Sequence, residues 1–164
     1  MNIQVVMMKQ DDPKKCSAAK LVKFGLAKPV KRTTSRTLVL DPFSKKILLK
    51  SDKKLASSVT GIDCSWNLAT TAFKNTFSGI PRKLPPLLAG NPVNYSKLNK
   101  LTTVEALAAA AYILGDSDMA TTLLDKFKWG HTFLALNKNI LQEYSEAESE
   151  SEIIEICQEY RLLE

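Results

Sequence analysis

The stretch Val59-Thr60-Gly61-Ile62-Asp63-Cys64-Ser65-Trp66, residues 59–66, is the part of the sequence that says most about the fold. A short apolar, β-rich run leads into a carboxylate, a thiol, a hydroxyl and an indole, which predicts a buried strand with polar groups at its end. In open α/β sheets, ligands bind beyond the carboxyl ends of the strands, where Asp63 would lie. The pattern leaves open a second role, in which Asp63 caps a helix that begins near Asn67. Trp66 can equally be core packing.

The residues before this strand alternate β-rich runs with helical patterns, which indicates βα units and a mostly parallel sheet. A helix is expected at residues 17–26, with Ser17 as its N-cap and Gly25 as its terminator. The other expected elements are strands at residues 3–8, 37–40 and 47–49, a turn at 41–44, one or two helical turns at 51–56, and a helix at 67–77.

Residues 79–95 differ from the rest because they hold four prolines and two glycines. Such a segment fits neither one helix nor one central strand, yet it is too apolar for a flexible linker. We therefore expect packed loop structure that shapes a site and marks the boundary between an α/β lobe, residues 1–85, and a helical lobe, residues 86–164.

The pattern after this segment is helical throughout. Thr102-Thr103-Val104-Glu105 is a capping box that opens a helix to residue 114, and Gly115 ends it. Further helices are expected at residues 116–128, 130–144 and 153–163, the last after the acidic stretch 145–152.

The net charge of +6 hides a strong division along the chain. Residues 1–100 carry 19 Lys and Arg against 5 Asp and Glu, and residues 101–164 carry 4 against 12. A half this basic favours nucleic acid as a partner, although a solvated surface rich in lysine would look the same. The candidates for phosphate contacts are Lys9, Lys14, Lys15, Lys20, Lys23, Lys28, Lys31, Arg32, Arg36, Arg82 and Lys83.

Several classes of function find no support in the sequence. The chain has one histidine, His131, and lacks G-x-S-x-G, Walker and G-x-G-x-x-G motifs, so hydrolysis by a metal ion or a catalytic triad is not expected. Three scattered cysteines without a CxxC pair indicate reduced thiols and no metal site. No apolar run reaches about 18 residues and no signal peptide is recognisable, so we expect a cytoplasmic protein.

An ordered series of motifs resembles the aminocarboxypropyltransferases that modify a hypermodified pseudouridine in the small-subunit ribosomal RNA of archaea and eukaryotes. The resemblance covers about residues 10–144, and the acidic tail lies outside it. It runs through Asp12-Pro13-Lys14-Lys15-Cys16-Ser17, Leu40-Asp41-Pro42, Asp63-Cys64-Ser65-Trp66, Arg82-Lys83-Leu84-Pro85, Asn91-Pro92-Val93-Asn94-Tyr95, Val104-Glu105-Ala106-Leu107-Ala108, Phe127-Lys128-Trp129-Gly130 and Phe133-Leu134-Ala135-Leu136-Asn137.

The resemblance implies an α/β fold like that of the SPOUT RNA methyltransferases, with a deep trefoil knot. It also implies S-adenosylmethionine as the cofactor, which the basic α/β lobe would bind together with RNA while the helical lobe completes the pocket. The product would be an aminocarboxypropyl group on N3 of a uridine-type base during ribosome biogenesis. We expect a monomer whose partner is small-subunit ribosomal RNA or a pre-ribosomal particle. The alternatives are a SPOUT-class RNA methyltransferase and a non-catalytic RNA-binding assembly factor.

The resemblance also implies roles for ten residues of the cofactor site. Ser17 and Thr103 would hold the amino-acid end of the cofactor, and Asp63 would lie near the reacting chain as the candidate general base. The remaining roles are the backbone of Ile62 at the ribose, Leu87, Leu101 and Ala106 around the adenine, Trp66 and Ala69 against the sulfonium methyl group, and Tyr95 in the pocket wall. Burying the methyl group leaves the aminocarboxypropyl carbon exposed to the incoming nitrogen.

Overall fold

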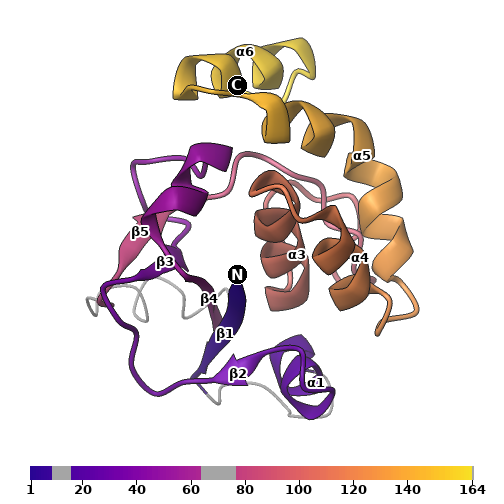
Figure 1. Ribbon diagram of the computed structural model, residues 1–164. Coiled ribbons are helices and arrows are strands. Elements are labelled where there is room, and N and C mark those ends of the chain that lie inside the picture. Colours follow the sequence, from indigo (N-terminus) through magenta and orange to yellow (C-terminus); the bar gives the residue numbers. More distant parts are fainter. Residues whose placement is uncertain (9–15, 64–76, 164) are drawn as a thin grey trace.

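The computed structural model describes residues 1–8, 16–63 and 77–163, and its centre is a parallel five-stranded sheet (Figure 1). The strands lie in the order β2-β1-β4-β3-β5, so β4 pairs with β1 on one side and with β3 on the other. Their bounds are β1 Asn2–Met7, β2 Lys28–Pro29, β3 Thr37–Leu40, β4 Ser58–Asp63 and β5 Ile80–Arg82. The expected parallel sheet and its strands near residues 3–8, 37–40 and 59–64 are confirmed.

The strand expected at residues 47–49 is wrong. Ile47 forms an isolated bridge with Lys83, and its N–H donates to Glu150 instead of continuing a ladder. The run is apolar because Leu48 is fully buried in the core. The proline-rich segment, in contrast, contributes the unexpected edge strand β5, in which Pro81 is exposed, as edge positions allow.

Five α-helices and one 3-10 helix are found among the described residues. They are α1 Ser17–Lys23, α3 Thr103–Ile113, α4 Ser117–Leu124, α5 Gly130–Glu146, α6 Glu150–Glu159 and η1 Lys50–Leu55. The helix expected at 116–128 ends early, at Leu124, and the last helix begins and ends earlier than expected. Residues 64–76, where most of the helix expected at 67–77 falls, lie outside the described part.

Helix ends follow the local chemistry at most positions. The capping box at α3 is confirmed, because the Thr102 hydroxyl accepts from the Glu105 N–H and the Glu105 carboxylate accepts from the Thr102 N–H. Gly115, at φ 97°, ends α3 as expected. The N-cap expected of Ser17 is wrong: Cys16 caps α1, its sulfur accepting from the Ala19 N–H at 3.4 Å.

Helix α3 is the centre of the helical layer. It packs against α4, α5, α1 and strand β4, and Figure 1 shows α3 and α4 beside the sheet with α6 above it. Gly61 in β4 allows this contact, because a Cβ there would lie 3.2 Å from Thr103 Cγ2 and 3.3 Å from Leu107. One apolar core includes residues on both sides of the expected lobe boundary, such as Leu38 and Leu107.

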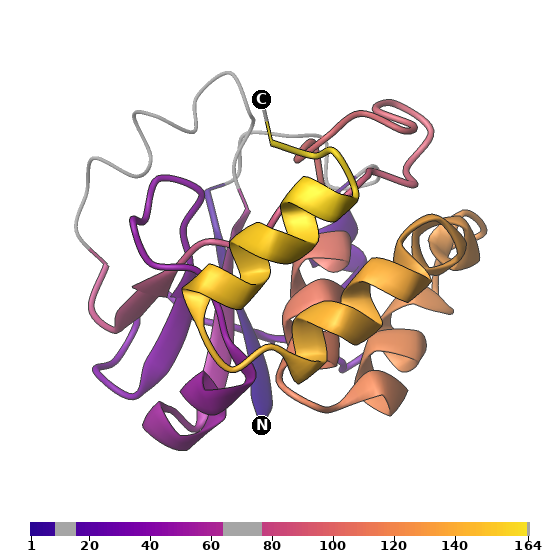
Figure 2. The same ribbon diagram turned by 90° about the horizontal axis from the view of Figure 1, so that it is seen from above.

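The acidic C-terminal segment folds back onto the basic half. Glu150, the first residue of α6, accepts a hydrogen bond from the Ile47 N–H at 2.9 Å. Figure 2 shows α6 crossing over the molecule next to α5. None of the described helices is long and apolar enough to cross a bilayer.

Candidate active site

Asp63, the last residue of β4, is held by donors from two helices. The Cys16 thiol donates to Oδ2 at 2.8 Å, and the Thr103 hydroxyl donates to Oδ1 at 2.8 Å. Cys16 is the N-cap of α1 and Thr103 is the first residue of α3, so three segments far apart in the sequence meet at one carboxylate. This is the carboxyl end of the sheet, where ligands of α/β proteins bind.

Ser17 joins the same group from the side of α1. It is buried, and its hydroxyl accepts from the Val104 N–H in the first turn of α3 at 3.2 Å. The first N–H groups of a helix lack intrahelical partners and carry partial positive charge, so α3 provides a favourable environment for an anionic group. We call Cys16, Ser17, Asp63 and Thr103 the Asp63 cluster.

Three members of the Asp63 cluster are predicted from the sequence, and Cys16 is not. The fold brings Ser17, Asp63 and Thr103 together, as the resemblance implies. Cys16 stands directly before Ser17 in the motif, and its position ahead of the expected helix is the signal that could have identified it as the N-cap. The preference of N-caps for hydroxyl and carboxamide side chains favoured Ser17 instead.

The chemistry of Cys16 follows from its surroundings. Burial raises the pKa of the Cys16 thiol to about 11, and the hydrogen bond to Asp63 adds to this shift. The thiolate is the reactive and metal-binding form of cysteine, so Cys16 is inert as a nucleophile at neutral pH. It is a neutral hydrogen-bond donor.

Glu105, in the first turn of α3, holds the loop between β5 and α3 by hydrogen bonds. This carboxylate is fully buried and accepts from the Gly90 N–H at 2.7 Å, from Asn91 Nδ2 at 2.7 Å, and from the N–H and hydroxyl of Thr102 at 2.9 Å each. Of these contacts, the sequence predicts only the capping contact with Thr102. Glu105 therefore holds the loop as well as the helix start.

Helix α5 holds the same loop from its other side. The Asn137 carboxamide pairs with both the N–H and the carbonyl of Leu88, and the Tyr144 hydroxyl donates to the Pro86 carbonyl at 2.8 Å. Gly90 packs so closely that a Cβ would lie 2.5 Å from the Phe133 nitrogen. The expected packed loop is thus confirmed, and in Figure 2 it lies at the edge opposite the start of β1.

The other residues named for the cofactor site differ in accessibility. Leu101 and Ala106 are half-buried around the start of α3, and Leu87 is fully buried in the core. Ile62 belongs to a small second apolar cluster with Val6 and Val39. Tyr95 is 58% exposed on the loop. Trp66 and Ala69 lie outside the described residues.

The basic residues named for RNA contacts fall into two groups. Exposed side chains, available to phosphates, are Lys20, Lys23, Lys28, Lys31, Arg32 and Arg36. Arg82 is different, because its Nε pairs with Asp52 at 3.2 Å and its Nη1 donates to the Pro81 carbonyl. Lys83 is half-buried, and Lys9, Lys14 and Lys15 lie outside the described residues.

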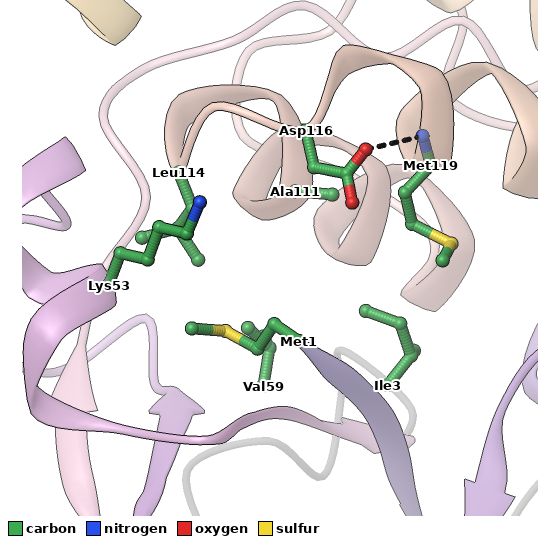
Figure 3. Close-up of a pocket in the computed structure, with 8 residues that line it drawn as sticks. All are labelled: Met1, Ile3, Lys53, Val59, Ala111, Leu114, Asp116 and Met119. Carbon is green, nitrogen blue, oxygen red and sulfur yellow. Dashed lines mark hydrogen bonds between the residues drawn. The ribbon is translucent and has the colours of Figure 1, made fainter.

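A small cavity lies at the other end of the sheet and is separate from the Asp63 cluster. Its volume is about 40 Å³, room for a few water molecules at most. Figure 3 shows Met1, Ile3 and Val59 from the amino-terminal ends of β1 and β4 below Ala111, Leu114, Asp116 and Met119, with Lys53 at the side. Because Asp63 is at the carboxyl end of β4, this cavity is not part of the candidate site.

Comparisons with known proteins agree on one family. Residues 38–161 match the model described as "Ribosome biogenesis protein, C-terminal". The chain is 42% identical to the 16S rRNA aminocarboxypropyltransferase of Methanococcoides burtonii, covering 97% of this chain and 94% of that protein. It is 44% identical to the protein of the same name from Thermoplasma acidophilum, covering 90% and 92%.

A solved structure is also similar, the SAM-dependent rRNA:acp-transferase Tsr3 from Vulcanisaeta distributa. The two chains are 38% identical with a TM-score of 0.85, covering 88% of this chain and 83% of the other. A second model, described as "Possible Fer4-like domain in RNase L inhibitor, RLI", matches residues 1–34. Iron–sulfur clusters need several cysteine thiolates, and residues 1–34 contain only Cys16, so this match implies no such cluster.

Proposed function

This chain belongs to the family of 16S rRNA aminocarboxypropyltransferases, and from this membership we propose that it transfers the 3-amino-3-carboxypropyl group of S-adenosylmethionine to small-subunit ribosomal RNA. The acceptor is N3 of a uridine or pseudouridine. The observation in this chain that carries the proposal is the Asp63 cluster, because it places one fixed carboxylate and two hydroxyl groups at the carboxyl end of the sheet.

The residues present fit S-adenosylmethionine. Its sulfonium and ammonium groups are positive and match the charge of Asp63, and its carboxylate matches the hydroxyl of Ser17 near the start of α3. The Thr103 hydroxyl donates its proton to Asp63, so it can accept a hydrogen bond from the ammonium group. The register of β3 with β4 ends at Leu40 with Gly61, so Ile62 lies one residue beyond it, which supports our assignment of the Ile62 backbone to the ribose. Leu101 and Ala106 offer half-buried apolar surface for the adenine and pack against the core cluster that contains Leu87, and we assign Tyr95 to the pocket wall.

The choice of transferred group depends on which carbon next to sulfur faces the RNA. S-adenosylmethionine supplies three electrophilic carbons, and the protein selects one by orientation. We assign the burial of the methyl group to Trp66 and Ala69, which follow Asp63 by three and six residues in the sequence. An indole face against a sulfonium group adds a cation–π contribution of about 1 kcal/mol or more.

Asp63 is our candidate for the general base that receives the N3 proton. Among the described residues, Cys16 donates to Oδ2 and Thr103 donates to Oδ1, and a carboxylate oxygen can accept more than one hydrogen bond. Replacement by Asn keeps the shape and removes the base. The Asp63→Asn variant should therefore lose single-turnover rate by about 100-fold or more, measured at a concentration of S-adenosylmethionine that calorimetry shows to be saturating. A full rate would leave Asp63 only a binding or structural role.

RNA docks on the basic half in this proposal. The exposed residues Lys20, Lys23, Lys31, Arg32 and Arg36 supply phosphate contacts, and Lys14, Lys15 and Lys83 join them. Arg82 contributes least, because its charge is already paired with Asp52. The target base must be unstacked to reach Asp63, as is usual for loops read by RNA-binding proteins.

The architecture implied by the family is also part of the proposal. Residues 1–85 bind RNA and cofactor, residues 86–164 complete the pocket, and the backbone forms the SPOUT-like trefoil knot in a monomeric protein. The hydrogen bonds of Thr103 with Asp63 and of the Val104 N–H with Ser17 join the two parts and support a shared pocket.

The direct test uses S-adenosylmethionine labelled either in the methyl carbon or in the carboxyl carbon. Each is incubated with the protein and with small-subunit RNA from a strain that lacks the enzyme. Label from the carboxyl carbon alone should enter the RNA, at a single uridine-type nucleotide located by primer extension. Label from the methyl carbon would instead indicate a methyltransferase, and neither label would indicate an RNA-binding assembly factor.

A further inference from the structure

Cys16 has two hydrogen-bonding roles, and the second of them requires a side chain that can donate. As the N-cap of α1 it accepts from the Ala19 N–H at 3.4 Å, a contact that serine, aspartate or asparagine makes better. Its second contact is the donation to Asp63 Oδ2 at 2.8 Å. Aspartate could cap α1 but could not donate to a carboxylate.

The two donors to Asp63 act together because they approach different oxygens. Cys16 reaches Oδ2 from α1, and Thr103 reaches Oδ1 from α3. A carboxylate held at both oxygens cannot turn about its Cβ–Cγ bond without losing a hydrogen bond. The donors themselves stand on segments linked by the Ser17 contact to the Val104 N–H. The orientation of Asp63 is therefore set by the packing of α1 against α3.

We propose that Cys16 is a positioning residue for group transfer, whose thiol holds the Asp63 carboxylate in the orientation that the reaction requires. This inference rests on the proposed function and adds a residue to it. Cys16 does not form a bond to substrate. Burial keeps its proton in place, since its pKa is raised to about 11, so it remains a donor throughout the neutral range.

The proposal predicts a particular kinetic pattern. Loss of the thiol donor removes the hydrogen bond from Cys16 to Asp63 Oδ2 while the groups that enclose the cofactor remain. A misplacement of a reacting group by about 1 Å can cost about 100-fold in rate. Binding of S-adenosylmethionine should thus change little, and the rate of transfer should fall.

The test compares Cys16→Ser, which keeps a donor, with Cys16→Ala and Cys16→Val, which remove it. Single-turnover transfer to RNA and calorimetric affinity for S-adenosylmethionine are measured for each. We expect Cys16→Ser to stay within about 3-fold of the parent rate. Both donor-free variants should lose about 10-fold or more while affinity stays within about 3-fold. Equal rates for all three variants would overturn the proposal.

Two controls separate positioning from general destabilisation. Cys157→Ala removes the other buried cysteine of the described residues, and Asp116→Ala removes the N-cap of α4; both should keep the parent rate. The decisive measurement is made on a double variant. In the Asp63→Asn background, adding Cys16→Ala should lower the rate of transfer by less than about 2-fold. Independent losses that multiply in the double variant would contradict an action through Asp63. Absence of transfer by the parent protein would instead reject the proposed function itself.

Discussion

Asp63 and Glu105 are two carboxylates whose positions determine the site, and the sequence revealed them to different degrees. Asp63 stood out because it ends an apolar strand, and Glu105 because it completes a capping box. Their partners Cys16 and Gly90 could not be predicted, because Cys16 is 47 residues from Asp63, and Gly90 is 15 residues from Glu105. Such contacts depend on the tertiary arrangement, which local patterns do not contain.

The raised pKa of Cys16 predicts a loss of stability at alkaline pH. The thiol holds its proton more tightly in the folded chain than in the unfolded chain, where its pKa is about 9.0. Its contribution is complete below pH 9 and disappears as the pH rises through about 11. The free energy of unfolding in urea, measured from pH 8 to 10.5, should fall more steeply for the parent than for Cys16→Ser.

The pH dependence of stability is compared between the parent and Cys16→Ser because Tyr144 also responds to alkaline pH. Burial and its contact with Cys157 raise the pKa of Tyr144, so this residue also destabilises both proteins at high pH. The difference between parent and Cys16→Ser cancels that common effect. A difference that does not change between pH 8 and 10.5 would show that the Cys16 thiol does not titrate as described.

Replacement of Glu105 by glutamine should be strongly destabilising. The carboxylate accepts four hydrogen bonds, and an amide would turn its own N–H groups toward donors from Gly90, Asn91 or Thr102. We expect a loss of about 2–4 kcal/mol in the free energy of unfolding. Chemical denaturation checks this value, with Glu155→Gln on the exposed face of α6 as the matched control. A loss below about 0.5 kcal/mol would mean that the network contributes little.

The elements of the fold were predicted well where a local pattern determines them. The buried strands at residues 37–40 and 58–63 and the capped helix α3 followed from apolar runs and turn chemistry. Strand β5 and the two-residue strand β2 were missed, since each contains a proline and pairs at a sheet edge. The run at residues 47–49 was misread because burial in a loop and burial in a strand look alike.

The loop between β5 and α3 should tolerate no side chain at Gly90. A Cβ would lie 2.5 Å from the Phe133 nitrogen and 2.6 Å from its Cα, so the loop must leave α5. We expect Gly90→Ala to lose more than about 2 kcal/mol in the free energy of unfolding and to weaken S-adenosylmethionine binding. Thermal and chemical unfolding, together with calorimetry, provide the measurements.

Gly25→Ala is the matched control for that substitution. Gly25 has a positive φ of 71° but open space around the position of a Cβ. The cost should be limited to about 1 kcal/mol from backbone strain, with cofactor binding unchanged. Equal losses at Gly25 and Gly90 would contradict the role assigned to the loop contact with α5.

The basic and the acidic half of the sequence lie in different parts of the folded molecule. The sheet half carries the exposed lysines and arginines around α1 and the strand edges, whereas α5 and α6 carry most of the glutamates. An RNA bound to the sheet half is thereby directed away from α6. Charge along the sequence suggested a nucleic-acid partner, but only family membership identified the RNA.

Substitution of Arg36 by glutamine should weaken RNA binding and lower its dependence on salt. If Arg36 contacts one phosphate, the slope of log affinity against log salt concentration should decrease by about 0.7 to 0.9. Fluorescence anisotropy with a small-subunit RNA fragment at several salt concentrations measures this slope. Lys138→Gln, on the exposed surface of α5, is the control and should leave it unchanged. An unaltered slope for Arg36→Gln would remove Arg36 from the docking surface.

The bond of S-adenosylmethionine that is broken decides which group reaches the RNA. Transfer of the aminocarboxypropyl group leaves methylthioadenosine, whereas transfer of the methyl group leaves S-adenosylhomocysteine. The most direct measurement is quantification of both small molecules by mass spectrometry after reaction with unmodified small-subunit RNA. We predict that methylthioadenosine forms in an amount equal to that of the modified nucleoside. S-adenosylhomocysteine, or no RNA-dependent product at all, would contradict it.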